Sequence, residues 1–232
     1  IHPEIADNFM VVSQNKHATE AGYEILKKGG NAIDASVAVG FALAVTLPRA
    51  GNLGGGGFIL IYDKDKDEVS SIDYRSAAPK SATSDLFLNG DQVVRFGHLV
   101  NAVPGSVAGL LKAHEDYGTL PLSELLKPAI RLAKDGFEVT YDLNFVLEWG
   151  KESMLANPSS KNKFYESSGD PIKVKSNFIQ PTLAKTLFMI SKRGSDIFYK
   201  GEIAQWISEE SLSNGGLITL EDMASYEAKY RE

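Results

Sequence analysis

Residues 51–75 read GNLGGGGFILIYDKDKDEVSSIDYR, a glycine run followed by two apolar segments and a single arginine. Four consecutive glycines, Gly54 to Gly57, lose more conformational entropy on folding than other residues, so we expect them where a side chain would obstruct a close backbone approach. The main functional alternative is a phosphate-binding loop, which requires GxxxxGK[ST] or GxGxxG at the start of a helix. Neither pattern occurs here, so a buried backbone or a bound substrate is the predicted neighbour. A glycine-rich turn that only lets two layers pack closely is the second interpretation.

Two apolar runs separated by a charged turn follow the glycines. Phe58 to Tyr62 have the length and composition of a buried strand, DKDKDE follows, and Val69 to Tyr74 form the second run. This order predicts a β-hairpin with a solvated tip. The acidic tip lacks the glycine and the terminal glutamate of a calcium-binding loop, so we predict no metal site.

Arg75 is the residue with the clearest potential for binding. It leaves an apolar strand beside the glycine loop, where a planar guanidinium can hold a carboxylate at two points. A structural ion pair is the alternative. The other chemistry-bearing residues are weaker candidates, because the four histidines are scattered without ligand spacing, no GxSxG motif occurs and there are no cysteines.

Composition narrows the classes of partner. The chain has 232 residues, is 43% hydrophobic and carries a formal net charge of −6 without a long Lys/Arg block. Nucleic acids and anionic membranes require a concentrated positive field, so we expect neither as a partner. The most apolar window, Ala32 to Leu47, falls short of the roughly 20 residues that span a bilayer. A small molecule or a peptide is therefore the expected partner.

Helical periodicity predicts an α+β chain whose second half is rich in helices. Asn31 is placed to cap the helix of Ala32 to Leu47, with Asp34 in its first turn. This helix is apolar on most of its surface, and we expect part of that surface to stay bare in residues 1–232 alone. No repeat or flexible linker is visible, so residues 1–232 are predicted to form a single domain. The predicted elements are a short strand at Met10 to Ser13, helices at His17 to Lys28, Ala32 to Leu47, Pro104 to Tyr117, Pro121 to Lys134, Tyr141 to Leu155, Pro181 to Lys192, Ile203 to Leu212 and Thr219 to Tyr226, and a surface excursion at 157–176.

Several long motifs carry a family resemblance. They are GGNAIDASVAVGFALAVTLP, GNLGGGGF, IDYR with a following AP, VPGSVAGL, YGTLPL, PAIRLAKDGF, and NGGLIT with EDMASY. In order and spacing they resemble the N-terminal part of the bacterial γ-glutamyltranspeptidases, from about Met10 to Arg231. The residues 1–232 would then be an incomplete N-terminal portion of the large subunit.

The resemblance implies an N-terminal nucleophile hydrolase with an αββα sandwich, made as an inactive precursor that cuts itself into a large and a small subunit. The implied nucleophile is a threonine at the start of the small subunit, so no catalytic residue is expected in this chain. The implied reaction is transfer of the γ-glutamyl group of glutathione or a related amide to an amino acid or to water, without a metal or an organic cofactor. The resemblance also implies the small subunit as a partner and a periplasmic or secreted location.

The resemblance assigns Arg75 to the family arginine that grips the α-carboxylate of the γ-glutamyl donor. It places Gly54 to Gly57 beside the core of the sandwich and outside the oxyanion hole. Ser76 is a departure, since the family usually has glutamate there, and it affects any secondary contact of that glutamate. Two alternatives remain: a related acylase that acts on another amide, and a non-catalytic binding module of the same ancestry.

Overall fold

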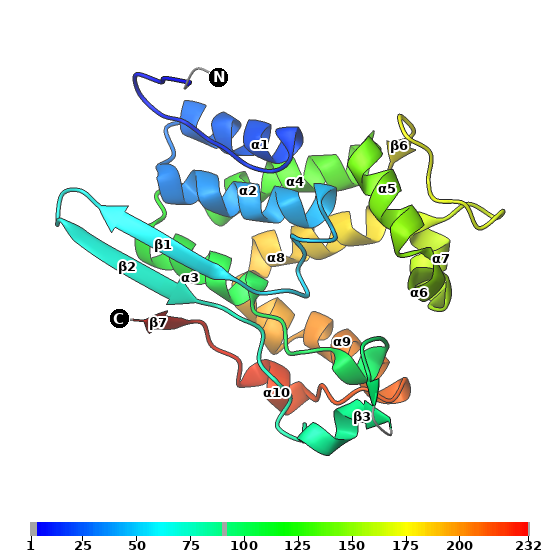
Figure 1. The fold of residues 1–232 in the computed structure, drawn as a ribbon. Helices are drawn as coiled ribbons and strands as arrows, with labels where there is room; N and C mark the ends of the chain where they lie inside the picture. The colour runs from blue at the N-terminus through cyan, green and yellow to red at the C-terminus, as the bar shows by residue number, and fades with distance from the viewer. Residues whose placement is uncertain (1–3, 90–91, 232) are drawn as a thin grey trace.

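The computed structural model describes residues 4–89 and 92–231, which form a mostly helical α+β structure with small sheets (Figure 1). The helices form a main layer around one continuous hydrophobic core, whose buried residues extend in sequence from Ala18 to Met223. The hairpin lies along one side of this layer (Figure 1). The helices of the layer are α1 (Lys16–Lys27), α2 (Ala32–Thr46), α3 (Ser106–Tyr117), α4 (Leu122–Asp135) and α8 (Pro181–Tyr199).

Helix α2 lies at the centre of the layer. Asn31 caps it and Asp34 completes a capping box, as the sequence predicts in part. Helices α1, α3 and α4 contact α2, and the side chains of Val37, Phe41 and Val45 are fully buried. The neighbouring helices of this same chain therefore cover most of α2, and the expectation of bare apolar surface holds only for a small part, since Val39 and Leu43 stay partly exposed.

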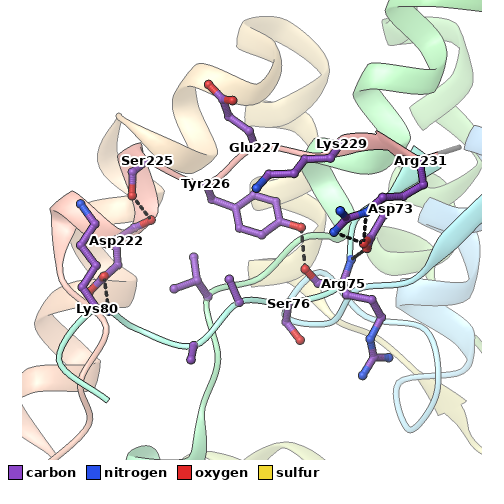
Figure 2. A pocket seen from close by; sticks show the side chains of 13 residues that line it. Asp73, Arg75, Ser76, Lys80, Asp222, Ser225, Tyr226, Glu227, Lys229 and Arg231 are labelled. Carbon is purple, nitrogen blue, oxygen red and sulfur yellow. Dashed lines mark hydrogen bonds and ion pairs between the residues drawn. The ribbon is translucent and has the colours of Figure 1, made fainter. Parts of the chain in front are cut away.

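The sheet nearest to the glycine run has three antiparallel strands. Strands β1 (Phe58–Asp63) and β2 (Glu68–Asp73) form the predicted hairpin, and β7 (Lys229–Arg231) pairs with the other edge of β2. The sequence does not predict β7, because three residues of alternating charge and aromatic character carry no strand pattern. The segment that leads into β7 thereby lies beside Arg75, where the Tyr226 hydroxyl contacts the Arg75 carbonyl (Figure 2).

The two faces of this sheet differ. Ile61 and Ile72 are buried against Ala113 of α3. Successive side chains of a strand point to opposite faces, and the large apolar side chains of the other face are exposed. The prediction of a fully buried first strand is therefore wrong for one face. That face exposes four large apolar side chains: Phe58 (61%), Leu60 (75%), Tyr62 (61%) and Val69 (69%).

The remaining elements correct the predicted boundaries. The helix predicted over Tyr141 to Leu155 is interrupted at Gly150, α8 continues past Lys192 through a break at Gly194, and Met10 to Ser13 form no strand. None of the helices in residues 4–89 and 92–231 has the length and apolar character to cross a membrane. The elements outside the main helical layer and the hairpin sheet are η1 (Ser84–Phe87), β3 (Leu88–Asn89), β4 (Gln92–Val93), η2 (His98–Val100), β5 (Phe137–Glu138), α5 (Tyr141–Trp149), α6 (Lys151–Leu155), α7 (Pro158–Phe164) within the predicted excursion, β6 (Asn177–Phe178), α9 (Glu202–Ser213) and α10 (Leu220–Ala224).

Candidate functional site

Arg75 lies two residues beyond the end of β2, and side chains hold its backbone. Its N–H donates to Asp73 Oδ1 at 2.9 Å, and its carbonyl oxygen accepts from the Tyr226 hydroxyl at 2.8 Å. The side chain of Arg75 is exposed. Figure 2 shows its guanidinium pointing away from Tyr226 and Arg231. The backbone of Arg75 is thus fixed while its charged group faces solvent.

Asp73 joins Arg75 to the last strand. Its Oδ2 accepts from Arg231 Nε at 3.0 Å, and Arg231 Nη2 lies 2.9 Å from the same oxygen (Figure 2). The N–H of Arg75 and the guanidinium of Arg231 hold the pKa of the Asp73 carboxyl below its usual value. Asp73 is therefore an anion at neutral pH, bonded to a different partner through each oxygen.

Tyr226 reaches Arg75 from the end of α10. Its ring stacks on Tyr199 at 5.6 Å with an interplanar angle of 12°. The Tyr199 hydroxyl donates to the carbonyl of Pro104 at 2.8 Å and accepts from the N–H of Ala108 at 3.1 Å. Burial raises the pKa of Tyr226 to about 12, with a contribution from the charge of Asp73. The hydroxyl of Tyr226 thus keeps its proton and acts as a donor at neutral pH.

The glycine run lies against the backbone of Tyr74 to Ser76. A Cβ on Gly56 would fall 2.5 Å from both Tyr74 O and Ser76 N, and a Cβ on Gly57 would fall 2.9 Å from the Tyr74 hydroxyl. A Cβ on Gly105 or Gly109 would also collide with Tyr74. A close backbone neighbour is confirmed at Gly56, although that backbone is only half-buried. Close packing, as in the second interpretation, accounts for Gly56 and Gly57.

Arg75 lines a cavity of about 480 Å³ between the end of β2 and the C-terminal segment. Its charged lining residues are Arg75, Lys80, Lys229, Arg231, Asp73, Asp222 and Glu227. Lys80 is paired with Glu221 and Arg231 with Asp73. Within residues 4–89 and 92–231, no carboxylate forms an ion pair with Arg75 or Lys229. The guanidinium of Arg75 can therefore receive an anionic group from the solvent side.

The other residues considered from sequence form no second site. His2 lies outside the described residues. The described histidines, His17, His98 and His114, have separate partners, namely Glu20, Glu210 and the carbonyl of Leu120. No group of three or more His, Asp and Glu side chains capable of holding a metal occurs in the part of the chain that the structure describes. Ser76 lines the cavity beside Arg75.

Sequence reasoning does not identify Asp73, Tyr226 or Arg231 as members of this site. Asp73 and Arg231 are 158 residues apart, and Arg75 and Tyr226 are 151 apart, so no local pattern links them. The motif EDMASY contains Tyr226 but by itself predicts only a helix start.

Comparisons with known proteins agree over nearly the whole chain. The sequence model of the Gamma-glutamyltranspeptidase family matches residues 18–232. The chain is 46% identical to the glutathione hydrolase proenzyme of Escherichia coli (strain K12) over 99% of this chain, and 37% identical to that of Bacillus subtilis (strain 168) over 97%. It spans about 40% of the length of these curated relatives.

Solved structures show the same similarity. The Helicobacter pylori gamma-glutamyltranspeptidase is 40% identical with a TM-score of 0.95, and the alignment covers 100% of this chain and 67% of that one. The Pseudomonas nitroreducens gamma-glutamyltranspeptidase in complex with L-DON is 40% identical with a TM-score of 0.91, over 98% and 68% of the two chains. The cephalosporin acylase of Bacillus halodurans is 27% identical with a TM-score of 0.78, over 100% and 46%.

Proposed function

The chain belongs to the gamma-glutamyltranspeptidase family and matches the N-terminal portion of its members, and from this we propose that it is part of a γ-glutamyltransferase and glutathione hydrolase. The reaction is transfer of a γ-glutamyl group from glutathione or a related amide to an amino acid or to water. In this proposal the nucleophile is a threonine of a later segment. Its hydroxyl attacks the γ-carbonyl, its own amine takes the proton, and the amide C–N bond breaks with protonation of the leaving amine. Water or an amino acid then takes the glutamyl group from the threonine oxygen.

The role of this chain is to anchor the donor through Arg75. The guanidinium binds the α-carboxylate of the γ-glutamyl group at two points. The observation that carries this role is a fixed backbone beneath an exposed guanidinium with no ion-pair partner among residues 4–89 and 92–231, at a cavity of about 480 Å³. Ser76 lines the same cavity and replaces the glutamate that the family usually has, which alters contacts next to the anchor.

We further propose that the chain forms one half of an αββα sandwich within a single domain. The described residues provide one helical layer and a three-stranded sheet, and one apolar face of that sheet is exposed. Two sheets that pack face to face bury such faces. The register places Asp73 opposite Phe58, so the side chain of Asp73 shares the exposed face. Arg75 follows two residues later. A second sheet, supplied by the later segment that includes the small subunit, would bring the nucleophile to that side. A periplasmic or secreted location rests on family resemblance alone.

The test uses the full-length protein with γ-glutamyl-4-nitroanilide and 4-aminobutanoyl-4-nitroanilide, which lacks the α-carboxylate. Arg75→Gln should lower kcat/KM for the γ-glutamyl donor by roughly ten- to a hundredfold, because a charge-assisted hydrogen bond contributes about 1.5 to 3 kcal/mol. Arg75→Lys should lose nearly as much, since an ammonium lacks the planar fork. Arg49→Gln is the matched control, because Arg49 pairs with Asp142 at another surface. An Arg75→Gln enzyme that still prefers the γ-glutamyl donor refutes the anchor.

A related acylase is the second candidate, because the cephalosporin acylase has the same fold over this chain. The same assay separates the two, since an acylase for another amide has no preference for an α-carboxylate. A non-catalytic binding module is distinguished by the full-length protein, which would then show no turnover of either substrate.

A further inference from the structure

The segment that contains Tyr226 and Arg231 controls the backbone of Arg75. Strand β2 ends at Asp73, so the N–H and the carbonyl of Arg75 lie beyond its hydrogen-bond ladder. The N–H bonds to Asp73 and the carbonyl bonds to Tyr226. Arg231 in turn holds the second oxygen of Asp73. Of the two side-chain hydrogen bonds to the Arg75 backbone, one therefore comes from this segment directly, and the other comes from Asp73, whose second oxygen this segment holds.

We propose that Tyr226 and Arg231 are positioning residues that direct the guanidinium of Arg75 toward the donor carboxylate. This inference rests on the proposed function. The position of a backbone fixes the direction of its Cα–Cβ bond, and two-point binding of a carboxylate requires that the fork be aligned in direction as well as in distance. A small displacement of a positioning group weakens productive binding even though the charge remains.

Tyr226 holds Arg75 through its hydroxyl, and its ring has a separate role. The ring stacks on Tyr199, whereas the hydroxyl donates to the Arg75 carbonyl. Tyr226→Phe therefore removes the bond to Arg75 and keeps the stacking. Tyr165→Phe is its matched control, because the Tyr165 hydroxyl also donates to a backbone carbonyl, that of Leu147, at 2.7 Å.

Arg231 acts through Asp73. Its Nε and Nη2 both approach Asp73 Oδ2, while Oδ1 accepts from the Arg75 N–H. Arg231→Lys keeps the positive charge and loses the fork. Arg131→Lys is its matched control, because Arg131 pairs with Glu24 at 2.8 Å on another part of the surface.

The experiment measures kcat and KM of the full-length enzyme with both nitroanilides. Tyr226→Phe and Arg231→Lys should each lower kcat/KM for γ-glutamyl-4-nitroanilide by about two- to tenfold, mainly through KM, since one hydrogen bond contributes about 0.5 to 1.5 kcal/mol. Turnover of 4-aminobutanoyl-4-nitroanilide should not change. In the Arg75→Gln background neither substitution should have a further effect, because the group that they position is absent. The inhibition constants of L-glutamate and 4-aminobutanoate report the same discrimination where turnover of the analogue is slow.

The controls separate positioning from stability. Tyr165→Phe should lower Tm about as much as Tyr226→Phe while leaving the ratio of kcat/KM between the two substrates unchanged. Equal losses on both substrates, or losses that persist in the Arg75→Gln background, overturn the positioning role and leave the role of Arg75 intact. If Arg75→Gln itself keeps the preference for the γ-glutamyl donor, the proposed anchor fails and this inference fails with it.

Discussion

Asp34 gives a quantitative test of how this helical layer is held together. Its carboxylate has no exposed surface and lies in the first turn of α2. It accepts from the N–H of Asn31 at 3.0 Å, the N–H of Thr119 at 3.0 Å, the hydroxyl of Thr119 at 2.6 Å and the N–H of Leu120 at 3.3 Å. One side chain thus caps α2 and fastens it to the turn between α3 and α4.

Asp34→Asn keeps the size of the side chain but replaces one acceptor oxygen with an NH₂ group that faces other donors. A hydrogen bond to a charged group contributes about 1.5 to 3 kcal/mol, and a buried donor left unsatisfied costs about 1 to 3 kcal/mol. The amide retains one oxygen, so part of the network survives. We expect the free energy of unfolding to fall by about 2 to 4 kcal/mol.

The effect should depend on pH. Burial raises the pKa of the Asp34 carboxyl, but the hydrogen bonds from Thr119, Asn31 and Leu120 outweigh it and hold the pKa below its usual value. A carboxyl with a lowered pKa in the folded state contributes stability that is present above the unfolded pKa of about 4 and is lost as the pH falls through the folded pKa. The difference between wild type and Asp34→Asn should therefore be greatest near neutral pH and should decrease below about pH 4.

The assay is urea unfolding of the full-length protein at a series of pH values. Asp65→Asn is the matched control, because Asp65 undergoes the same chemical change at the exposed hairpin tip. If Asp34→Asn unfolds at the same urea concentration as Asp65→Asn, or if their difference does not vary with pH, the carboxylate does not hold the layer as described.

Three further predictions follow from the described contacts. Gly105→Ala should lower both Tm and kcat/KM for the γ-glutamyl donor, because its Cβ would collide with Tyr74 and Tyr226 beside the anchor; Gly29→Ala has open space and should affect Tm alone, through its φ of +89°. Residues 1–232 alone should show no hydrolysis of a γ-glutamyl amide above background. Turnover in a sample that contains no full-length enzyme would refute the proposal that the nucleophile lies outside these residues. The same isolated chain should bind a hydrophobic dye at its sheet, and Leu60→Ser, at a side chain that is 75% exposed, should reduce the dye signal without lowering Tm.

The sequence predicts those features whose determinants lie within a few residues of one another. Asn31 caps α2 as expected, a helix begins after Thr219 as expected, and the hairpin around the acidic tip is confirmed. The sequence does not predict which helices bury α2 or which face of the sheet is exposed. Both depend on which distant segments pack together, and periodicity reports only that a surface is apolar.

The candidate site likewise contains residues that local sequence patterns identify and residues that they do not. The strand and the glycine run identify Arg75, and the close packing at Gly56 is confirmed. Local patterns cannot identify Tyr226 and Arg231, because their contacts with Arg75 and Asp73 join segments that are 151 and 158 residues apart. Binding of a carboxylate by Arg75 stays a prediction.

Strand β7 is synthesised well after its partner β2, so the edge of β2 stays unpaired for a time during protein synthesis. A ribosome adds about 5 to 20 residues per second, so about ten to thirty seconds pass between the synthesis of Arg75 and that of Arg231. During this interval the hairpin presents to the cell both its apolar face and the edge of β2 that β7 later pairs with. Such an edge is a template for pairing with another chain. The nascent protein is therefore more prone to aggregate before β7 docks, and the backbone of Arg75 gains its contact with Tyr226 only after this interval.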